Sequence, residues 1–167
     1  MRRGMAFSLL SLLLFTSLGA CTAPKKAVFP FDAPMVDKED KSTSLESLRG
    51  RPLVVVAYAA SMPDCRRRIE KFVELSEAFG NREVTFVAID ISPIEAKQFP
   101  DVVSVRAGNA LFVKDVEGAA GRALKVDLIP TTFFVSRKGE ILEKVEAVHS
   151  WDGGDFRNRV EKFLENS

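Results

Sequence analysis

The side chain best suited to chemistry is the thiol of Cys65, which ends the segment Met62-Pro63-Asp64-Cys65. Pro63 is typical of the first position of an α-helix, where the N–H that proline lacks would have no partner. Cys65 is therefore expected in the first turn of a helix, where free backbone N–H groups and the helix dipole stabilise a thiolate. Residues 66–68 are three arginines that could stabilise the same charge.

Two apolar runs and one amphipathic segment would position this thiol. Residues 53–58 and 84–91 are short and rich in β-branched residues, which predicts buried strands. Between them, apolar residues recur at helical spacing as far as Phe79, and Gly80 stands where a left-handed cap would end a helix. The order strand, helix, strand predicts a βαβ unit with parallel strands.

The flanking regions predict further elements. Residues 29–48 have the pattern of a β-hairpin, and residues 116–125 that of a helix unsettled by two glycines. A last amphipathic helix is expected to open at Trp151-Asp152. Residues 92–115 are weakly patterned; their runs 102–105 and 110–113 would suit short strands.

A second hairpin is expected near the end of the chain. Residues 131–136 and 140–148 read as strands, and the turn at 137–139 that joins them is short enough to require antiparallel pairing. Such a hairpin would bring Pro130 beside Val148 at one end of the sheet.

The first 20 residues predict an export signal, because Arg2 and Arg3 precede an apolar run that is too short for a comfortable membrane span. The segment Leu18-Gly19-Ala20-Cys21 resembles a bacterial lipobox, in which the chain is cut before a cysteine that then carries lipid. We therefore expect lipidation at Cys21, a tether over residues 21–28 and one domain over residues 29–167. The domain would be exported and would face the periplasm or the cell exterior from its lipid anchor.

Charge and cysteine count narrow the functions further. The predicted signal holds two of the 24 basic residues and none of the 23 acidic ones, so the processed chain has a net charge of −1. A nucleic-acid partner is not expected at that charge. With Cys21 lipidated, Cys65 would be the one thiol left in an oxidising compartment.

Over roughly residues 31–165 the chain resembles the TlpA/ResA-like family of membrane-anchored thioredoxins. The matching pieces are Leu45-x-x-Leu48-x-Gly50-Arg51-Pro52-Leu53-Val54-Val55, Tyr58-Ala59-Ala60, Ile129-Pro130-Thr131-Thr132-Phe133-Phe134-Val135 and Lys138-Gly139. The resemblance implies an α/β domain of thioredoxin-like fold, with a mixed central sheet between helices and an N-terminal β-hairpin extension.

In that family the proline of the Pro-Thr-Thr-Phe segment follows a cis peptide bond. The resemblance therefore implies a cis bond between Ile129 and Pro130, facing Cys65. It also implies a substrate groove of Ile129, Pro130, Thr131 and Val148, where backbone hydrogen bonds could hold an extended partner segment.

The active turn departs from the family pattern of two cysteines separated by two residues. In the family the first cysteine attacks and the second resolves the mixed disulfide; here those positions hold Met62 and Cys65. Val56 stands where many relatives have a buried acid or amide. Because a thioether cannot form a disulfide, the dithiol cycle cannot run within this chain.

Two roles for Cys65 remain open. In the first, it forms a mixed disulfide with an extracytoplasmic protein or a small thiol, and a separate thiol resolves it. In the second, it is a buried helical thiol and the domain is a redox-inactive module that holds a partner peptide at the cis-proline. Neither role calls for a cofactor.

Two other chemistries fit the residues less well. A one-cysteine peroxidase of the peroxiredoxin type would need threonine, proline and arginine where this chain has Met62, Tyr58 and Pro130. Copper would suit a set of Met62, Cys65 and His149, because soft sulfur ligands and imidazole bind it. That spacing matches no established metal motif.

Overall fold

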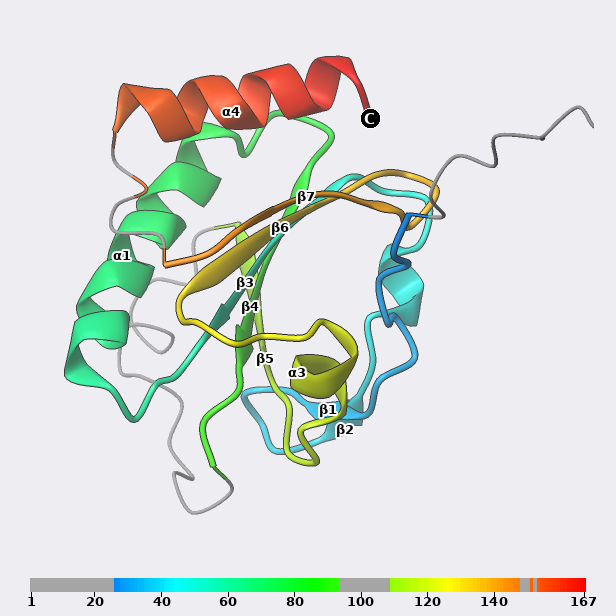
Figure 1. The fold of residues 1–167 in the computed structure, drawn as a ribbon, viewed down its shortest axis with the longest axis vertical. Coiled ribbons are helices and arrows are strands. Elements are labelled where there is room, and N and C mark those ends of the chain that lie inside the picture. The colour runs from blue at the N-terminus through cyan, green and yellow to red at the C-terminus, as the bar shows by residue number, and fades with distance from the viewer. Residues whose placement is uncertain (1–25, 94–108, 148–150, 152) are drawn as a thin grey trace, which may run out of the picture.

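The computed structural model describes residues 26–93, 109–147, 151 and 153–167. Their secondary structure follows the expected order of a hairpin, a βαβ unit, a second hairpin and a helix (Figure 1). The elements are β1 (Met35–Val36), β2 (Ser42–Thr43), η1 (Glu46–Leu48), β3 (Leu53–Tyr58), α1 (Pro63–Ala78), β4 (Thr85–Asp90), β5 (Ala110–Lys114), α3 (Ala119–Ala123), β6 (Thr131–Val135), β7 (Ile141–Val145) and α4 (Gly154–Glu165).

The strands form one seven-stranded sheet in the order β2-β1-β5-β4-β3-β6-β7. The three central strands β5, β4 and β3 are parallel to one another, and the outer pairings are antiparallel. The fold is thus the mixed α/β sheet that the resemblance implied. The N-terminal hairpin is β1–β2, and the Asp37 carboxylate closes its turn by accepting the Lys41 N–H at 3.0 Å.

Two apolar cores lie on opposite faces of the sheet. Val54, Val56 and Tyr58 belong to the core beneath α1 and α4, whereas the β3 residues that alternate with them belong to a second core. The N-terminal segment and α3 cover that second face (Figure 1). All described core residues fall between positions 29 and 163.

The C-terminal helix begins later than the sequence predicted. It starts at Gly154, with Gly153 as its N-cap, rather than at Trp151-Asp152. The Trp151 side chain is only 1% exposed, and its indole N–H donates to Thr132 Oγ1 at 3.2 Å. Trp151 is therefore a core residue that precedes α4 rather than the first residue of that helix.

Two helix predictions need correction. Gly80 has no positive φ, so the expected left-handed cap of α1 is absent; a Cβ there would instead collide with the Asn109 side-chain amide. The helical stretch predicted over 116–125 is only the five residues of α3, because Gly118 in front of it adopts a left-handed conformation with φ +67°. The strand predicted over 110–113 is present as β5, whereas 102–105 lies outside the described residues.

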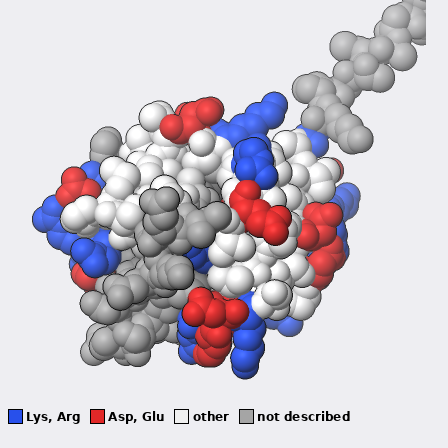
Figure 2. Space-filling view, turned by 90° about the horizontal axis from the view of Figure 1, so that it is seen from below, with Lys and Arg blue, Asp and Glu red and all other residues white. Residues whose placement is uncertain are grey.

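The described surface has no dominant charge on the face seen from below Figure 1. Basic and acidic side chains are interspersed among the uncharged residues drawn there (Figure 2). None of the described helices combines the length and the apolar character that crossing a bilayer would require.

Candidate functional site

The candidate site is the turn that connects β3 to α1, at the C-terminal end of the parallel strands. Met62 is the N-cap of α1, with an extended backbone at φ −96° and ψ 117°, and Pro63 follows in the first helical turn. The Met62 N–H donates to the Ala59 carbonyl at 3.1 Å. Ser61, Met62, Pro63 and Asp64 are all exposed, so this turn presents a thioether to solvent.

Cys65 lies beneath that turn. Its side chain is 3% exposed and belongs to the same core as Ile69 and Phe72 on α1. Cys65 is free, and the sequence contains no other cysteine except Cys21. A disulfide could reach a sulfur so well covered only after the first turn of α1 opens locally.

The arginines after Cys65 are directed mainly to solvent. Arg66 and Arg67 are exposed, and Arg67 forms an ion pair with the carboxylate of Asp64 on the surface of the helix. The positive run predicted to assist a thiolate is thus partly neutralised and lies outside the core that holds the sulfur.

Pro130, the proline expected to face Cys65, lies at the end of the sheet that carries the β3–α1 turn. The Ile129–Pro130 peptide bond is cis, and Thr131 pairs with Ala57 near the end of β3. Ile129 packs against the core that contains Cys65. Leu128, in front of it, is 53% exposed, so this end carries a second exposed apolar side chain besides Met62.

The predicted residues are thus placed together only in part. Met62, Cys65 and Pro130 are brought to one end of the sheet. Val148, His149 and Cys21 lie outside the described residues, so the far side of the groove, the copper set and the lipidation site stay predictions.

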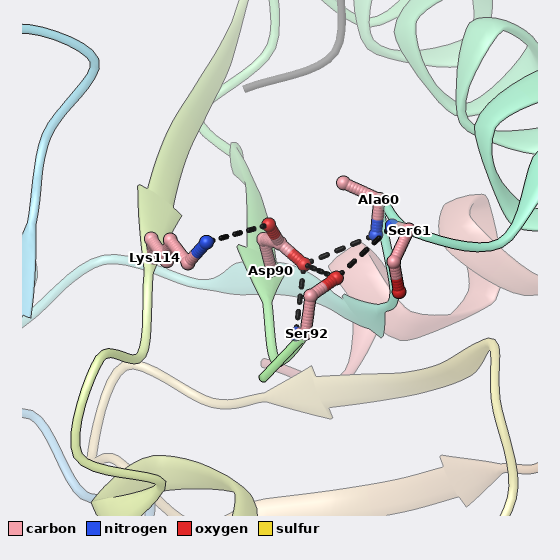
Figure 3. Close-up of polar contacts among 5 residues, drawn as sticks. All are labelled: Ala60, Ser61, Asp90, Ser92 and Lys114. Carbon is pink, nitrogen blue, oxygen red and sulfur yellow. Dashed lines mark hydrogen bonds and ion pairs between the residues drawn. The ribbon is translucent and has the colours of Figure 1, made fainter. Parts of the chain in front are cut away.

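A buried carboxylate, which sequence reasoning missed, holds the turn in place. Asp90, at the end of β4, is fully buried, and its Oδ1 accepts the Ala60 N–H at 3.1 Å (Figure 3). The same oxygen accepts the Ser92 N–H at 2.9 Å and the Ser92 hydroxyl at 2.6 Å. Ser92 Oγ in turn accepts the Ser61 N–H at 3.1 Å. Two consecutive amides of the active turn are therefore bound to the end of β4.

The charge of Asp90 is paired inside the protein. Lys114 Nζ lies 3.9 Å from Asp90 Oδ2, and the two side chains are 6% and 0% exposed (Figure 3). The strand register aligns Tyr58, Asp90 and Lys114 across β3, β4 and β5. Among the described residues the buried Tyr58 hydroxyl has no hydrogen-bond partner. Burial, and secondarily the charge of Asp90, raise the pKa of Tyr58, so this phenol stays protonated.

One signal in the sequence could have indicated this cluster. Asp90 interrupts the apolar run that predicts β4, and Lys114 follows directly on the run that predicts β5. The carboxyl ends of parallel strands meet at one edge of a sheet, so two charges of opposite sign at those ends indicate a buried pair. Many members of the resembling family have a buried acid or amide at position 56, whereas here Val56 is buried in the apolar core.

The geometry defines what this site can do. The turn exposes Met62 and covers Cys65, and the Asp90 carboxylate beneath it makes four polar contacts with three residues, Ala60, Ser92 and Lys114. Such a site can present a fixed surface to a partner. Cys65 is the one thiol among the described residues, and the thioether of Met62 cannot complete a dithiol cycle.

Solved structures with the same fold include several thiol–disulfide proteins. A thiol:disulfide interchange protein of the thioredoxin family from Chlorobium tepidum is 23% identical, with a TM-score of 0.62 over 85% of this chain and 99% of that one. The thioredoxin domain of a thiol-disulfide oxidoreductase from Bacteroides vulgatus is 18% identical, with a TM-score of 0.64 over 86% and 99%.

A secreted disulfide oxidoreductase from Mycobacterium tuberculosis is also 18% identical, with a TM-score of 0.60 over 80% of this chain and 95% of that one. At these identities the likeness establishes the thioredoxin-like fold. No curated protein matches the chain. The model of the Redoxin family matches residues 22–159, most of the sequence, and the chain therefore belongs to the Redoxin family.

Proposed function

We propose that this protein is an extracytoplasmic, lipid-anchored thioredoxin-fold protein of the TlpA/ResA-like type that binds a partner segment without dithiol chemistry. The observation that carries the proposal is the burial of Cys65, 3% exposed, beneath a Met62 that is 47% exposed. The position that attacks substrate in dithiol relatives is here an apolar contact residue.

The surface around the turn supports binding. Met62 and Leu128 are two of the few large apolar side chains that the described surface exposes, and both belong to the end of the sheet that carries Pro130. Asp90 and Ser92 hold the turn amides in fixed positions. A preorganised apolar surface loses less conformational entropy on binding, which favours an extended peptide of an extracytoplasmic protein as the partner.

The location is proposed from the N-terminal sequence. The signal-like residues 1–20 and the lipobox-like Leu18-Gly19-Ala20-Cys21 support export and acylation of Cys21. The similar Mycobacterium tuberculosis protein is itself described as secreted.

Monothiol exchange is the second candidate, and the place of Cys65 in the first turn of α1 favours it. After local opening, the Cys65 thiolate would attack a partner's disulfide, forming a mixed disulfide and releasing the partner's other sulfur as a thiolate. A small thiol would then attack the mixed disulfide as a thiolate. That step frees Cys65 and leaves the small thiol disulfide-bonded to the partner.

Alkylation of Cys65 tests the two candidates against each other. We would follow the labelling rate against pH by mass spectrometry on the folded chain from residue 22 onward, with the denatured chain as reference. Binding without thiol chemistry predicts labelling at least about a hundredfold slower when folded, because attack requires local opening. Fast labelling of the folded chain would overturn that proposal and support monothiol exchange.

Partner capture gives an independent readout. Cys65→Ser should leave the set of bound partners unchanged, whereas Met62→Asp should abolish binding by placing a charge on the apolar contact surface. If Cys65→Ser instead removes a complex that reductant also dissolves, the mixed-disulfide candidate is correct.

A further inference from the structure

The end of the sheet opposite the active turn carries an arginine-lined cleft. Its volume is about 310 Å³, and it is lined by Arg51, Arg82, Glu83, Val84, Thr85 and Arg137. These residues come from the loop before β3, the α1–β4 connection, the start of β4 and the β6–β7 turn. Three arginine residues from different loops therefore line one open cleft.

The cleft has more positive charge than its own carboxylate can neutralise. Glu83 accepts a hydrogen bond from Arg137 at 2.8 Å, which pairs those two groups. Within the described part of the chain, neither Arg51 nor Arg82 has a carboxylate partner. Guanidinium groups bind phosphate through parallel N–H donors, so two of them at one cleft suit a phosphate group.

The N-terminal segment enters the fold beside this cleft. The Phe29 N–H donates to the Gly139 carbonyl at 2.9 Å, and Lys26 pairs with Glu140 at 3.5 Å, both in the β6–β7 turn region that supplies Arg137. Figure 1 shows the blue segment at the right, next to that turn and far from the first turn of α1. Lys26, the first described residue, thus lies at the same end of the sheet as the arginine-lined cleft.

We infer that this cleft binds the phosphate groups of anionic phospholipids at the membrane to which Cys21 is anchored. Lys26 is only five positions after Cys21, so an anchored domain keeps this end within about 18 Å of the bilayer surface. The six-residue strand β3 spans about 20 Å, and that distance separates the cleft from the active turn. Docked in this way, the protein directs Met62 and Pro130 away from the membrane toward its partners.

The orientation rests on the proposed anchor, but the contact can be tested without it. The chain from residue 21 with Cys21→Ser carries no lipid, and its co-sedimentation would be measured with vesicles of equal parts phosphatidylglycerol and phosphatidylcholine. We expect salt-sensitive binding to these vesicles and none to pure phosphatidylcholine. Failure here would overturn the docking inference while leaving partner binding and the anchor untouched.

Charge reversal locates the contact. Arg51→Glu with Arg82→Glu should weaken vesicle binding by more than about twenty-fivefold, because each basic group near an anionic surface contributes about fivefold and the new carboxylates add repulsion. The matched control is Arg66→Glu with Arg67→Glu, which makes the same change in net charge at the opposite end of the sheet and should have little effect. Equal loss in both variants would mean non-specific attraction and would overturn the assignment.

A second arm distinguishes lipid from a soluble anion. Inorganic phosphate should raise the melting temperature only slightly, because one phosphate lacks the surrounding charged surface. Saturable stabilisation by phosphate without any vesicle binding would make the cleft a soluble-anion site and overturn the membrane assignment. Circular dichroism would confirm that both variants fold; if the reversal does not, Arg51→Gln with Arg82→Gln takes its place, with a loss of about twenty-fivefold expected.

Discussion

At the scale of single residues, this chain differs from dithiol relatives in having the thioether of Met62 where they have a cysteine thiol. Met62 occupies the N-cap of α1 and Cys65 the third helical residue, so the two positions keep the spacing of a Cys-x-x-Cys turn. The two amides just before Met62, those of Ala60 and Ser61, donate to Asp90 and Ser92. We therefore expect that one side chain, rather than a distorted turn, removes the dithiol pair.

Met62→Cys tests that statement. A thiol at the exposed N-cap should form an internal disulfide with Cys65 in air, because both positions belong to one helical turn. Mass spectrometry after alkylation would show the loss of two labelled thiols, and reduction of a disulfide substrate would report activity. Cys65→Ser in the same background is the control and should abolish both signals. A folded variant whose thiols both stay free would mean that the turn itself has diverged.

Tyr58 gives a pH-dependent prediction. It is the single tyrosine of the chain, so phenolate absorbance reports it alone. Its pKa is raised in the folded state by burial and by Asp90, whereas the unfolded value is about 10. The stability associated with the neutral phenol is therefore fully present below pH 10 and is lost as pH rises above it.

We expect no phenolate signal until the alkaline unfolding transition. The difference in unfolding free energy between the native chain and Tyr58→Phe should fall by up to about 1.4 kcal/mol per pH unit above pH 10. Urea titrations at several alkaline pH values would measure it. Phenolate absorbance in a protein that is still folded near pH 10 would contradict the predicted burial.

The sequence predicted the site's chemistry better than its accessibility. Pro63 and the apolar spacing after it place Cys65 in a first helical turn, and the structure agrees. Whether Cys65 faces the core or the solvent depends on how α1 packs on the sheet. That packing is a tertiary property, which a local sequence pattern does not determine. The buried pair of Asp90 and Lys114 was not predicted for a related reason. A charged residue at the end of an apolar run usually indicates the end of a strand, not a buried ion pair.

At the scale of elements, the Asp90 cluster joins β4 and β5 to the active turn. A buried ion pair stabilises little in itself, but removing one partner leaves an uncompensated charge and usually costs about 3–5 kcal/mol. Because Asp90 also accepts the Ala60 amide, its loss should loosen the turn as well as the sheet.

We therefore expect Asp90→Ala to lower the free energy of unfolding by about 3–5 kcal/mol. Removing Lys114 as well, by Lys114→Met, should recover part of that loss, because the buried ammonium group is then removed together with its carboxylate partner. Hydrogen exchange at the Ala60 and Ser61 amides should accelerate in the single variant. Glu143→Gln, which breaks the exposed pair with Arg159, is the control and should cost less than about 1 kcal/mol. A loss as small as the control's would show that the cluster does not bear on stability.

Strands were predicted more accurately than helix ends. The buried strands β3, β4 and β6 each have an apolar run that needs no tertiary information. The start of α4 was misplaced because Trp151 lies in the core, where its contact with Phe72 has ring centroids 5.7 Å apart. Helix propensity is a local property of the sequence, so it cannot predict such a tertiary contact.

At the scale of the whole molecule, one sheet supports both the active-turn core and a second core closed by the N-terminal segment. Phe31 is central to the second core. Its side chain is 1% exposed, and its ring packs edge-on against Phe29 at 5.0 Å. The Arg49 guanidinium lies 4.6 Å from the ring centre, and a Cβ at Gly139 would come within 2.9 Å of it. The N-terminal hairpin is therefore joined to the β6–β7 turn through this ring.

Phe31→Ala should consequently lower the free energy of unfolding by about 3–5 kcal/mol, the usual cost of emptying a buried aromatic site. Val28→Ala is the matched control, because Val28 is 59% exposed and its loss should change stability by less than about 0.5 kcal/mol. Denaturant unfolding followed by both circular dichroism and Trp151 fluorescence would measure the effect. Since β3 contributes to both cores, the two probes should report one coincident transition. An early loss of circular dichroism that leaves Trp151 fluorescence unchanged would contradict this expectation. It would mean that the N-terminal hairpin unfolds independently of the core that contains Trp151, and that its position beside the arginine-lined cleft is not coupled to the active turn.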